Sequence, residues 1–186
     1  MEIRELTVGP IGTRCYILWK EGHQGCAVID PGGEPERIMR AADGRPVEAI
    51  LLTHGHFDHI GGVSGLMKEG TRLIIHPLDE KMLHDPELNA GLALMGRNIT
   101  APPATDLVRE GDRFEAAGLT VEVLHTPGHT QGSVCYQIEG ELFTGDTLFE
   151  HGWGRTDLPG GDETAMFASL RRLMRLAKTM PVHPGH

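Results

Sequence analysis

The sequence is poor in aromatic residues, in cysteine and in long apolar runs, and these shortages exclude several classes of protein. Phe, Trp and Tyr make up 5% of the 186 residues. No stretch approaches the roughly 18 consecutive apolar residues of a membrane-spanning helix, so we expect a soluble protein with no membrane partner. The cysteines Cys15, Cys26 and Cys135 lie far apart in apolar runs. This pattern favours buried thiols over disulfides or a thiolate zinc cluster.

Basic residues are also scarce. The chain has 17 Lys and Arg against 26 Asp and Glu, which gives a formal net charge of −9. Binding to a phosphate backbone needs clustered cations, so we expect no nucleic-acid partner. Residues 1–8 alternate as in a strand and lack the basic flank and apolar core of a secretory signal, which predicts a cytoplasmic protein. An acidic surface is compatible with a monomer or a homodimer.

Histidine, with eleven copies, is present in unusual number, and a compact group follows one apolar strand. Residues 47–53 form an apolar run that leads into His54-Gly-His56-Phe-Asp58-His59. Burying these groups together is costly without a partner, and a metal ion supplies one. His54 and His56 are two residues apart in extended chain, so both rings point the same way and can chelate one ion. Asp58 and His59 lie where the chain turns, facing a neighbouring position.

Three later segments repeat the pattern of an apolar strand followed by a metal-ligating residue type. Residues 121–126 precede His129, residues 142–144 precede Asp146, and Val182 precedes His186. Side chains at strand ends, on loops held by a sheet, are a common arrangement for functional sites. The pattern therefore predicts one site for two adjacent ions.

The order of elements predicts a single domain, residues 1–186, in which sheets and helices pack together. We expect strands near 2–8, 14–19, 26–29, 47–53, 73–75, 119–124, 133–138 and 141–144, and helices near 35–42, just after 62 and from 162 onward. Between Asp85 and Ile99, the residues Leu88, Leu92 and Met95 recur at helical spacing. They predict a helix that packs on the core or covers a pocket.

The motifs together resemble the metallo-β-lactamase superfamily. The chain contains H-G-H-F-D-H at 54–59, T-P-G-H-T at 126–130, F-T-G-D at 143–146 and H-P-G-H at 183–186, in that order. The resemblance implies an α/β fold of the α+β type, an αββα four-layer sandwich of two mixed sheets, with metals at one edge. By position, it implies one metal held by His54, His56 and His129, a second held by Asp58, His59 and His186, and Asp146 as the bridge.

Two segments favour one branch of this superfamily. Gly145-Asp146 and the run 154–162 (G-R-T-D-L-P-G-G-D) are similar to the short single-domain glyoxalase II-like (hydroxyacylglutathione hydrolase-like) enzymes. True β-lactamases lack the aspartate bridge and are exported. Full-length glyoxalase II enzymes carry a further C-terminal domain that binds glutathione, so recognition of glutathione is open here. The family usually continues past the last histidine, and we therefore expect a chain truncated after His186.

The resemblance implies a metal-dependent hydrolase with two divalent ions, zinc first, with iron or manganese as alternatives, since all seven ligands donate nitrogen or oxygen. A bridging water with its pKa lowered toward roughly 7 would attack the carbonyl of a small-molecule thioester or ester, such as S-lactoylglutathione. Asp58 is expected to orient this nucleophile as well as bind metal. Arg155 either holds a substrate carboxylate or pairs with Asp157, and the sequence leaves both open.

Three other functions remain open at this point. A mononuclear iron, persulfide dioxygenase-like oxidoreductase shares the scaffold and a similar G-R-T-D segment, but it would not need the second set of ligands. A lactonase and a non-catalytic metal-binding domain are the weaker alternatives. We favour thioester hydrolysis because His186 completes a second metal position.

Overall fold

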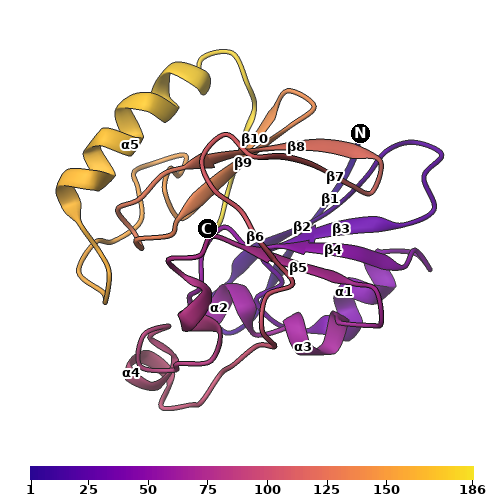
Figure 1. The fold of residues 1–186 in the computed structure, drawn as a ribbon, viewed down its shortest axis with the longest axis horizontal. Coiled ribbons are helices and arrows are strands. Elements are labelled where there is room, and N and C mark those ends of the chain that lie inside the picture. Colours follow the sequence, from indigo (N-terminus) through magenta and orange to yellow (C-terminus); the bar gives the residue numbers. More distant parts are fainter.

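Two mixed β-sheets face each other in the computed structural model, which describes residues 1–186 (Figure 1). The first sheet has the order β1–β2–β3–β4–β5–β6, with β1 (Glu2–Val8), β2 (Thr13–Trp19), β3 (Cys26–Ile29), β4 (Val47–Leu51), β5 (Arg72–Ile75) and β6 (Asp106–Leu107). The second has the order β11–β10–β9–β8–β7, with β7 (Arg113–Ala116), β8 (Leu119–His125), β9 (Val134–Ile138), β10 (Glu141–Gly145) and β11 (Val182–Pro184).

Helices cover the outer faces of both sheets. They are α1 (Pro35–Ala41), α2 (Phe57–Ile60), α3 (Val63–Leu66), the short 3-10 helix η1 (Glu80–Leu83), α4 (Gly91–Met95) and α5 (Glu163–Leu176). Figure 1 shows α5 over the second sheet and α1 and α3 beneath the first. This arrangement confirms the predicted αββα sandwich. None of the helices is long and apolar enough to cross a membrane.

The long helix α5 follows from its cap and its apolar stripe. Asp162 precedes the helix, and its Oδ1 accepts a hydrogen bond of 2.9 Å from the N–H of Ala165. Such a cap stabilises a helix by about 1 kcal/mol. Met166, Leu170 and Leu173 are buried on one face, and Leu173 packs in a small cluster on the outer side of the second sheet. Burial of this stripe fixes the helix over the sheet.

The space between the sheets holds the main core, and two tyrosines there connect the sheets near the predicted site. The Tyr16 hydroxyl donates to the carbonyl of Pro184 at 2.7 Å, and the Tyr136 hydroxyl donates to the carbonyl of Leu52 at 2.8 Å. Buried tyrosines need such partners, because an unpaired hydroxyl loses its water. Both hydrogen bonds cross from one sheet to the segment carrying a predicted ligand on the other.

Backbone hydrogen bonds bring the ends of β4, β10 and β11 together at one edge of the sandwich. The N–H of Val134 donates to the carbonyl of Thr53 at 2.8 Å. The N–H of Gly185 donates to the carbonyl of Gly145 at 2.8 Å, and the Gly185 carbonyl accepts from Arg14 N–H at 2.7 Å. The C-terminal end of the chain is thereby held between the two sheets (Figure 1).

The predicted helix between residues 85 and 99 is wrong in extent, because only Gly91–Met95 is helical. The side-chain amide of Asn89 donates to the carbonyls of Met82 and Ile99, both at 2.9 Å, which folds the segment into a compact loop. Ala90 has φ of 63°, so the helix cannot extend backward through it. Leu92 is 42% exposed, so it does not pack in the core as predicted.

Candidate metal centre

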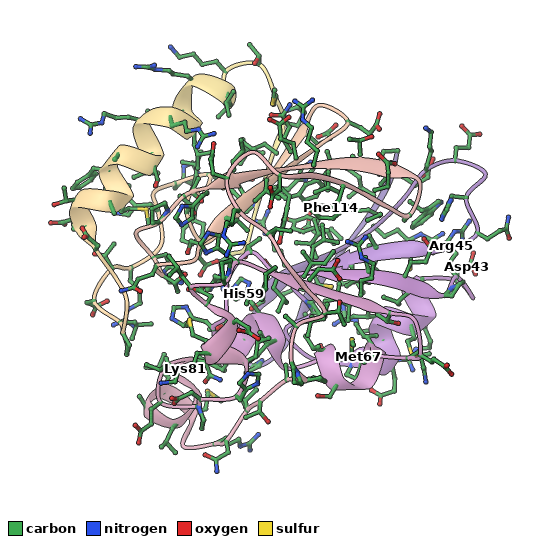
Figure 2. All side chains as sticks on the ribbon, viewed as in Figure 1. Asp43, Arg45, His59, Met67, Lys81 and Phe114 are labelled. Atoms are coloured by element: carbon green, nitrogen blue, oxygen red, sulfur yellow. The ribbon has the colours of Figure 1, made fainter.

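Five segments deliver the predicted ligands to this edge. His54 and His56 follow β4, and Asp58 and His59 lie on α2. Each of the other three follows a strand: His129 follows β8, Asp146 follows β10 and His186 follows β11. Figure 2 shows His59 beside α2, at the edge where the C-terminal end lies in Figure 1. Residues up to 132 positions apart in the sequence are therefore neighbours in space, since His54 and His186 belong to one cluster through His59.

The first group, which we call the three-histidine set, consists of His54, His56 and His129. All three are buried, and one ring nitrogen from each lies within 4.8 Å of the others. Burial, followed by the neighbouring His129, lowers the pKa of His56 to about 3, and burial also lowers the pKa of His54 well below its ordinary value. His54 and His56 are therefore neutral at neutral pH, as metal ligation by imidazole requires.

The second group, which we call the carboxylate set, consists of Asp58, His59 and His186, with one ligand atom from each within 4.8 Å. Burial opposes ionisation of Asp58, but His59 and His186 outweigh it and lower the pKa of Asp58. Burial alone would lower the pKa of His59, yet Asp58, Asp30 and Asp146 raise it well above its ordinary value. Asp58 and His59 are thus charged, whereas His54 and His56 are neutral.

Asp146 lies between the two groups. Its carboxylate oxygens are 3.4 Å from His59 Nε2, 3.5 Å from His129 Nε2 and 3.6 Å from His186 Nε2. It thus touches a member of the three-histidine set and two members of the carboxylate set. Burial opposes its ionisation, but His59 and His129 lower its pKa. Asp146 is therefore the residue of the cluster whose carboxylate lies near members of both groups.

Unpartnered polar atoms show that the cluster fits a metal. His54 Nε2, His59 Nε2 and Asp146 Oδ1 are buried and have no hydrogen-bond partner. In addition, His56 Nδ1 and His129 Nε2 lie within hydrogen-bond distance of each other, at 2.8 Å. Buried polar atoms without partners are costly in a native protein. Divalent ions bound to these nitrogen and oxygen donors would remove that cost and take the place of the contact between the two rings.

Hydrogen bonds on the far side of two rings fix which nitrogen is free, and a carboxylate lies behind a third ring. The Thr53 hydroxyl donates to Asp30 Oδ2 at 2.7 Å, so Thr53 Oγ accepts from His54 Nδ1 at 3.0 Å and leaves Nε2 free. His129 Nδ1 donates to the carbonyl of Arg155 at 2.7 Å. His59 Nδ1 lies 3.0 Å from Asp30 Oδ2. Partners of this kind orient a ligating ring and raise its basicity.

Sequence reasoning missed three polar residues behind the ligands. Asp30, the first residue of the run D-P-G-G, is buried, accepts a hydrogen bond from Thr53 and lies beside His59 Nδ1. Thr13 is fully buried, and its hydroxyl donates to Asp58 Oδ2 at 2.9 Å. Asp79 is also buried and accepts hydrogen bonds from both histidine-bearing loops. Asp30 has φ of 49°, and D-P-G-G is an ordinary turn signal, so no pattern separates it from a loop residue.

Two glycines permit the close approach of the segments that carry the ligands. A Cβ at Gly185, next to His186, would collide with Asp146 Oδ1, and it would come within 3.0 Å of the Gly145 carbonyl carbon. Gly145 itself has φ of 48°, and a Cβ there would collide with Thr53 Oγ. These positions therefore need glycine for steric reasons as well as for conformation.

Arg155 lies apart from the buried cluster. Its guanidinium forms two hydrogen bonds with Asp157, at 2.6 and 2.7 Å, and the side chain is 52% exposed. The ion pair that the sequence left as one alternative is thus present. Arg155 contacts the buried cluster through its backbone carbonyl, which accepts the hydrogen bond from His129.

Known proteins match the chain along almost its whole length. The family model described as "Metallo-beta-lactamase superfamily" matches residues 8–186. The chain is 35% identical to "Probable metallo-hydrolase YqgX" of Bacillus subtilis, over 100% of this chain and 90% of that protein. It is 33% identical to "Hydroxyacylglutathione hydrolase GloC" of Haemophilus influenzae, over 100% and 91%.

Solved structures agree with the fold. The structure of "BLEG-1 B3 metallo-beta-lactamase" superposes with a TM-score of 0.94 at 37% identity, covering 100% of this chain and 91% of that one. That of TTHA1623 "in a di-iron-bound form" has a TM-score of 0.84 at 39% identity, covering 98% and 91%. Similar proteins are thus named both as a metallo-β-lactamase and as a hydroxyacylglutathione hydrolase, so overall similarity does not separate these branches. The chain belongs to the metallo-beta-lactamase superfamily of metallo-hydrolases.

Proposed function

We propose that the chain is a glyoxalase II-like thioester hydrolase that uses two divalent metal ions to cleave S-lactoylglutathione or a related small acyl thioester. The observation that carries this proposal is the complete carboxylate set beside the three-histidine set, with Asp146 in contact with both. The 33% identity to the hydroxyacylglutathione hydrolase GloC supports the same reaction class.

The ligands divide into two positions. His54, His56 and His129 would hold one ion, Asp58, His59 and His186 the other, and Asp146 would contact both. Bound divalent ions supply a water of lowered pKa and stabilise negative charge on a carbonyl oxygen. Nitrogen and oxygen donors suit zinc, iron and manganese. We propose zinc as the first choice, and the di-iron form of TTHA1623 supports iron as the alternative.

The chain's own residues contribute orientation and charge. The lowered pKa of Asp58 keeps its carboxylate ionised, so it can accept a hydrogen bond from an attacking water and orient it. Thr13 holds this carboxylate in place through its 2.9 Å hydrogen bond. Burial of Asp58 and His59 excludes bulk water from one side of the site, which strengthens their electrostatic interactions. Arg155, if released from Asp157, would bind a substrate carboxylate at the surface.

A thioester suits this site because its leaving group needs little assistance. A thiolate is a weak base, with a thiol pKa of about 8.5, so it departs without full protonation. The chemical demand is then concentrated on delivery of the nucleophile and stabilisation of the carbonyl oxygen. Metal ions bound at this edge of the sandwich would provide both.

The test is anaerobic hydrolysis of S-lactoylglutathione by metal-loaded protein, with the reaction monitored through the loss of the thioester absorbance. We expect turnover without oxygen and its loss on treatment with a chelator, and a panel of other thioesters, esters and lactones would define the acyl preference. Asp146→Asn is the matched variant, since it keeps the shape of the side chain and removes its charge.

The main alternative, a persulfide dioxygenase-like oxidoreductase, makes the opposite prediction. It requires a single iron and consumes oxygen with glutathione persulfide as substrate. Oxygen consumption together with no anaerobic thioester turnover would therefore replace our proposal by this one. Metal-loaded protein inactive in both assays would favour a non-catalytic role.

A further inference from the structure

We propose that Asp79 is a positioning residue for the three-histidine set. It holds the loop of His54 and His56 against the loop of His129, so that the three rings are preorganised for one divalent ion. The inference rests on the proposed metal site and adds a residue that contacts none of the ligands' metal-facing atoms.

Asp79 connects two loops that come from different sheets. Its Oδ2 accepts from the N–H of Gly55 at 3.1 Å and from the hydroxyl of Thr130 at 2.6 Å, while Oδ1 accepts from the N–H of Gly132 at 2.7 Å. Gly55 lies between His54 and His56 in the sequence, and Thr130 follows His129 directly. One carboxylate therefore binds the immediate chain neighbours of all three histidines.

The packing around Asp79 is tight, so the position of this residue constrains the two loops that carry the histidines. A Cβ on Gly132 would lie 2.6 Å from Asp79 Oδ1, and a Cβ on Gly55 would lie 2.6 Å from Met82 Cβ. The Asp79 backbone is fixed in turn, since its N–H donates to the His76 carbonyl at 3.0 Å and its carbonyl accepts from Met82 N–H at 2.9 Å. Both loops thus press against a segment that is itself held.

Only an ionised carboxylate satisfies this environment fully. Gly55, Thr130 and Gly132 all present donors to Asp79, which is 1% exposed, so a group that only accepts matches them. Asparagine would turn an amide N–H toward at least one of these donors and leave it unpaired. Burial raises the pKa of Asp79, and the hydrogen bonds from Thr130, Gly132 and Gly55 oppose that shift. These hydrogen bonds therefore favour the ionised form of the carboxylate.

The contact between the rings of the three-histidine set depends on how the two loops are held. His56 Nδ1 and His129 Nε2 are 2.8 Å apart, and they belong to the two loops that Asp79 joins. If the loops relax apart, part of the binding free energy goes into re-forming the site, and the ion binds more weakly. The carboxylate set is supported differently, through Thr13 and Asp58.

The experiment measures metal affinity at each position in the full chain. Protein loaded with two cadmium ions gives two ¹¹³Cd NMR resonances, because the ligand sets differ, and a competing chelator removes the ions in order of affinity. In Asp79→Asn we expect the affinity of the three-histidine position to fall about 10- to 100-fold, as for other residues that orient metal ligands, and the affinity of the carboxylate position to stay unchanged.

Thr13→Val is the matched control, since it removes the hydrogen bond to Asp58 Oδ2 and should weaken the carboxylate position only. Should Asp79→Asn fail to fold, Thr130→Val and Thr130→Ser answer the same question. The valine removes one donor to Asp79 and the serine keeps it, so we expect weaker binding at the three-histidine position in the first and wild-type binding in the second.

Wild-type affinity at both positions in Asp79→Asn or Thr130→Val, whatever the change in thermal stability, would overturn the inference. Equal weakening at both positions would overturn it too, because it indicates a general loss of structure. Wild-type protein that binds no metal would instead refute the proposed function itself, and the two failures are thereby distinguished.

Discussion

The two ligand sets of this site differ in how firmly the fold holds them. In the three-histidine set all members are buried, and His54 and His129 each have a hydrogen bond that fixes the ring. In the carboxylate set, Asp58 and His59 are buried, but His186 is 25% exposed and its ring nitrogen contacts only the carboxylates of Asp58 and Asp146. The first set is fully buried, whereas the second contains charged groups and is completed by a partly exposed ring.

Because of this difference, we expect the two ions to bind with different affinities and with different release of protons. The three-histidine set is ready to bind, because burial keeps His54 and His56 neutral. The carboxylate set must first release a proton, because the carboxylates around His59 raise its pKa. We therefore expect the three-histidine position to bind its ion more tightly at neutral pH.

The largest effect should come from the residue that both sets share. In Asp146→Asn we expect thioester hydrolysis to fall about 1000-fold, equivalent to about 4 kcal/mol of transition-state stabilisation, because the group that would contact both ions loses its negative charge and one of its two donor oxygens. Steady-state kinetics with matched metal loading measure this change. Activity within about threefold of the wild type would show that Asp146 does not bridge.

Single-set variants should separate the two positions. His186→Ala should lower metal affinity at the carboxylate position by at least about 100-fold, which exceeds the effect of removing a residue that merely orients a ligand, and should leave the other ion bound. His56→Ala should do the reverse. Metal content after gel filtration measures both effects. Loss of both ions in His186→Ala would contradict the prediction that the two positions bind metal independently.

The pH dependence of metal affinity should also differ between the two positions. Above neutral pH, affinity at the carboxylate position should rise about tenfold per pH unit until His59 is deprotonated, because one proton leaves as the ion binds. Affinity at the three-histidine position should stay constant there, since the pKa of His54 and His56 is lowered by burial. Calorimetry in buffers of different ionisation enthalpy counts the released protons.

The smallest effect should come from the guanidinium of Arg155. Arg155→Ala removes an exposed ion pair with Asp157 but keeps the backbone carbonyl that binds His129, so metal affinity should change by less than about twofold. If Arg155 also binds substrate, the KM for anionic thioesters rises while that for neutral ones is unchanged. A loss of bound metal would contradict the assignment of the contact to the backbone.

Local patterns in the sequence predicted sheets and helices that pack together, and the αββα sandwich followed from the resemblance of the motifs to a known family. Each segment that carries predicted ligands comes within a few residues of an apolar stretch, and that juxtaposition can be seen without a structure. The strand β6, at Asp106–Leu107, and β7, at Arg113–Ala116, were not predicted, since two residues and an exposed edge strand carry little alternation. Their place in the sheets depends on neighbours that lie far away in the chain.

The residues that hold the ligands in place were beyond sequence reasoning for a related reason. Asp79 follows the apolar strand β5 by four residues, as His129 follows β8, but a single aspartate in H-P-L-D has the pattern of an ordinary turn residue. Its importance arises only when loops from both sheets meet around it. The incorrect helix between 85 and 99 has the converse cause, because an apolar repeat was given more weight than the side-chain hydrogen bonds of Asn89.

The most direct test of the two-ion site is anomalous diffraction from crystals of the metal-loaded protein, with data collected on both sides of the metal absorption edge. Two peaks are expected, one among His54, His56 and His129 and one among Asp58, His59 and His186, with Asp146 in contact with both. A single peak at the three-histidine set, or no peak at this edge of the sandwich, would contradict the account.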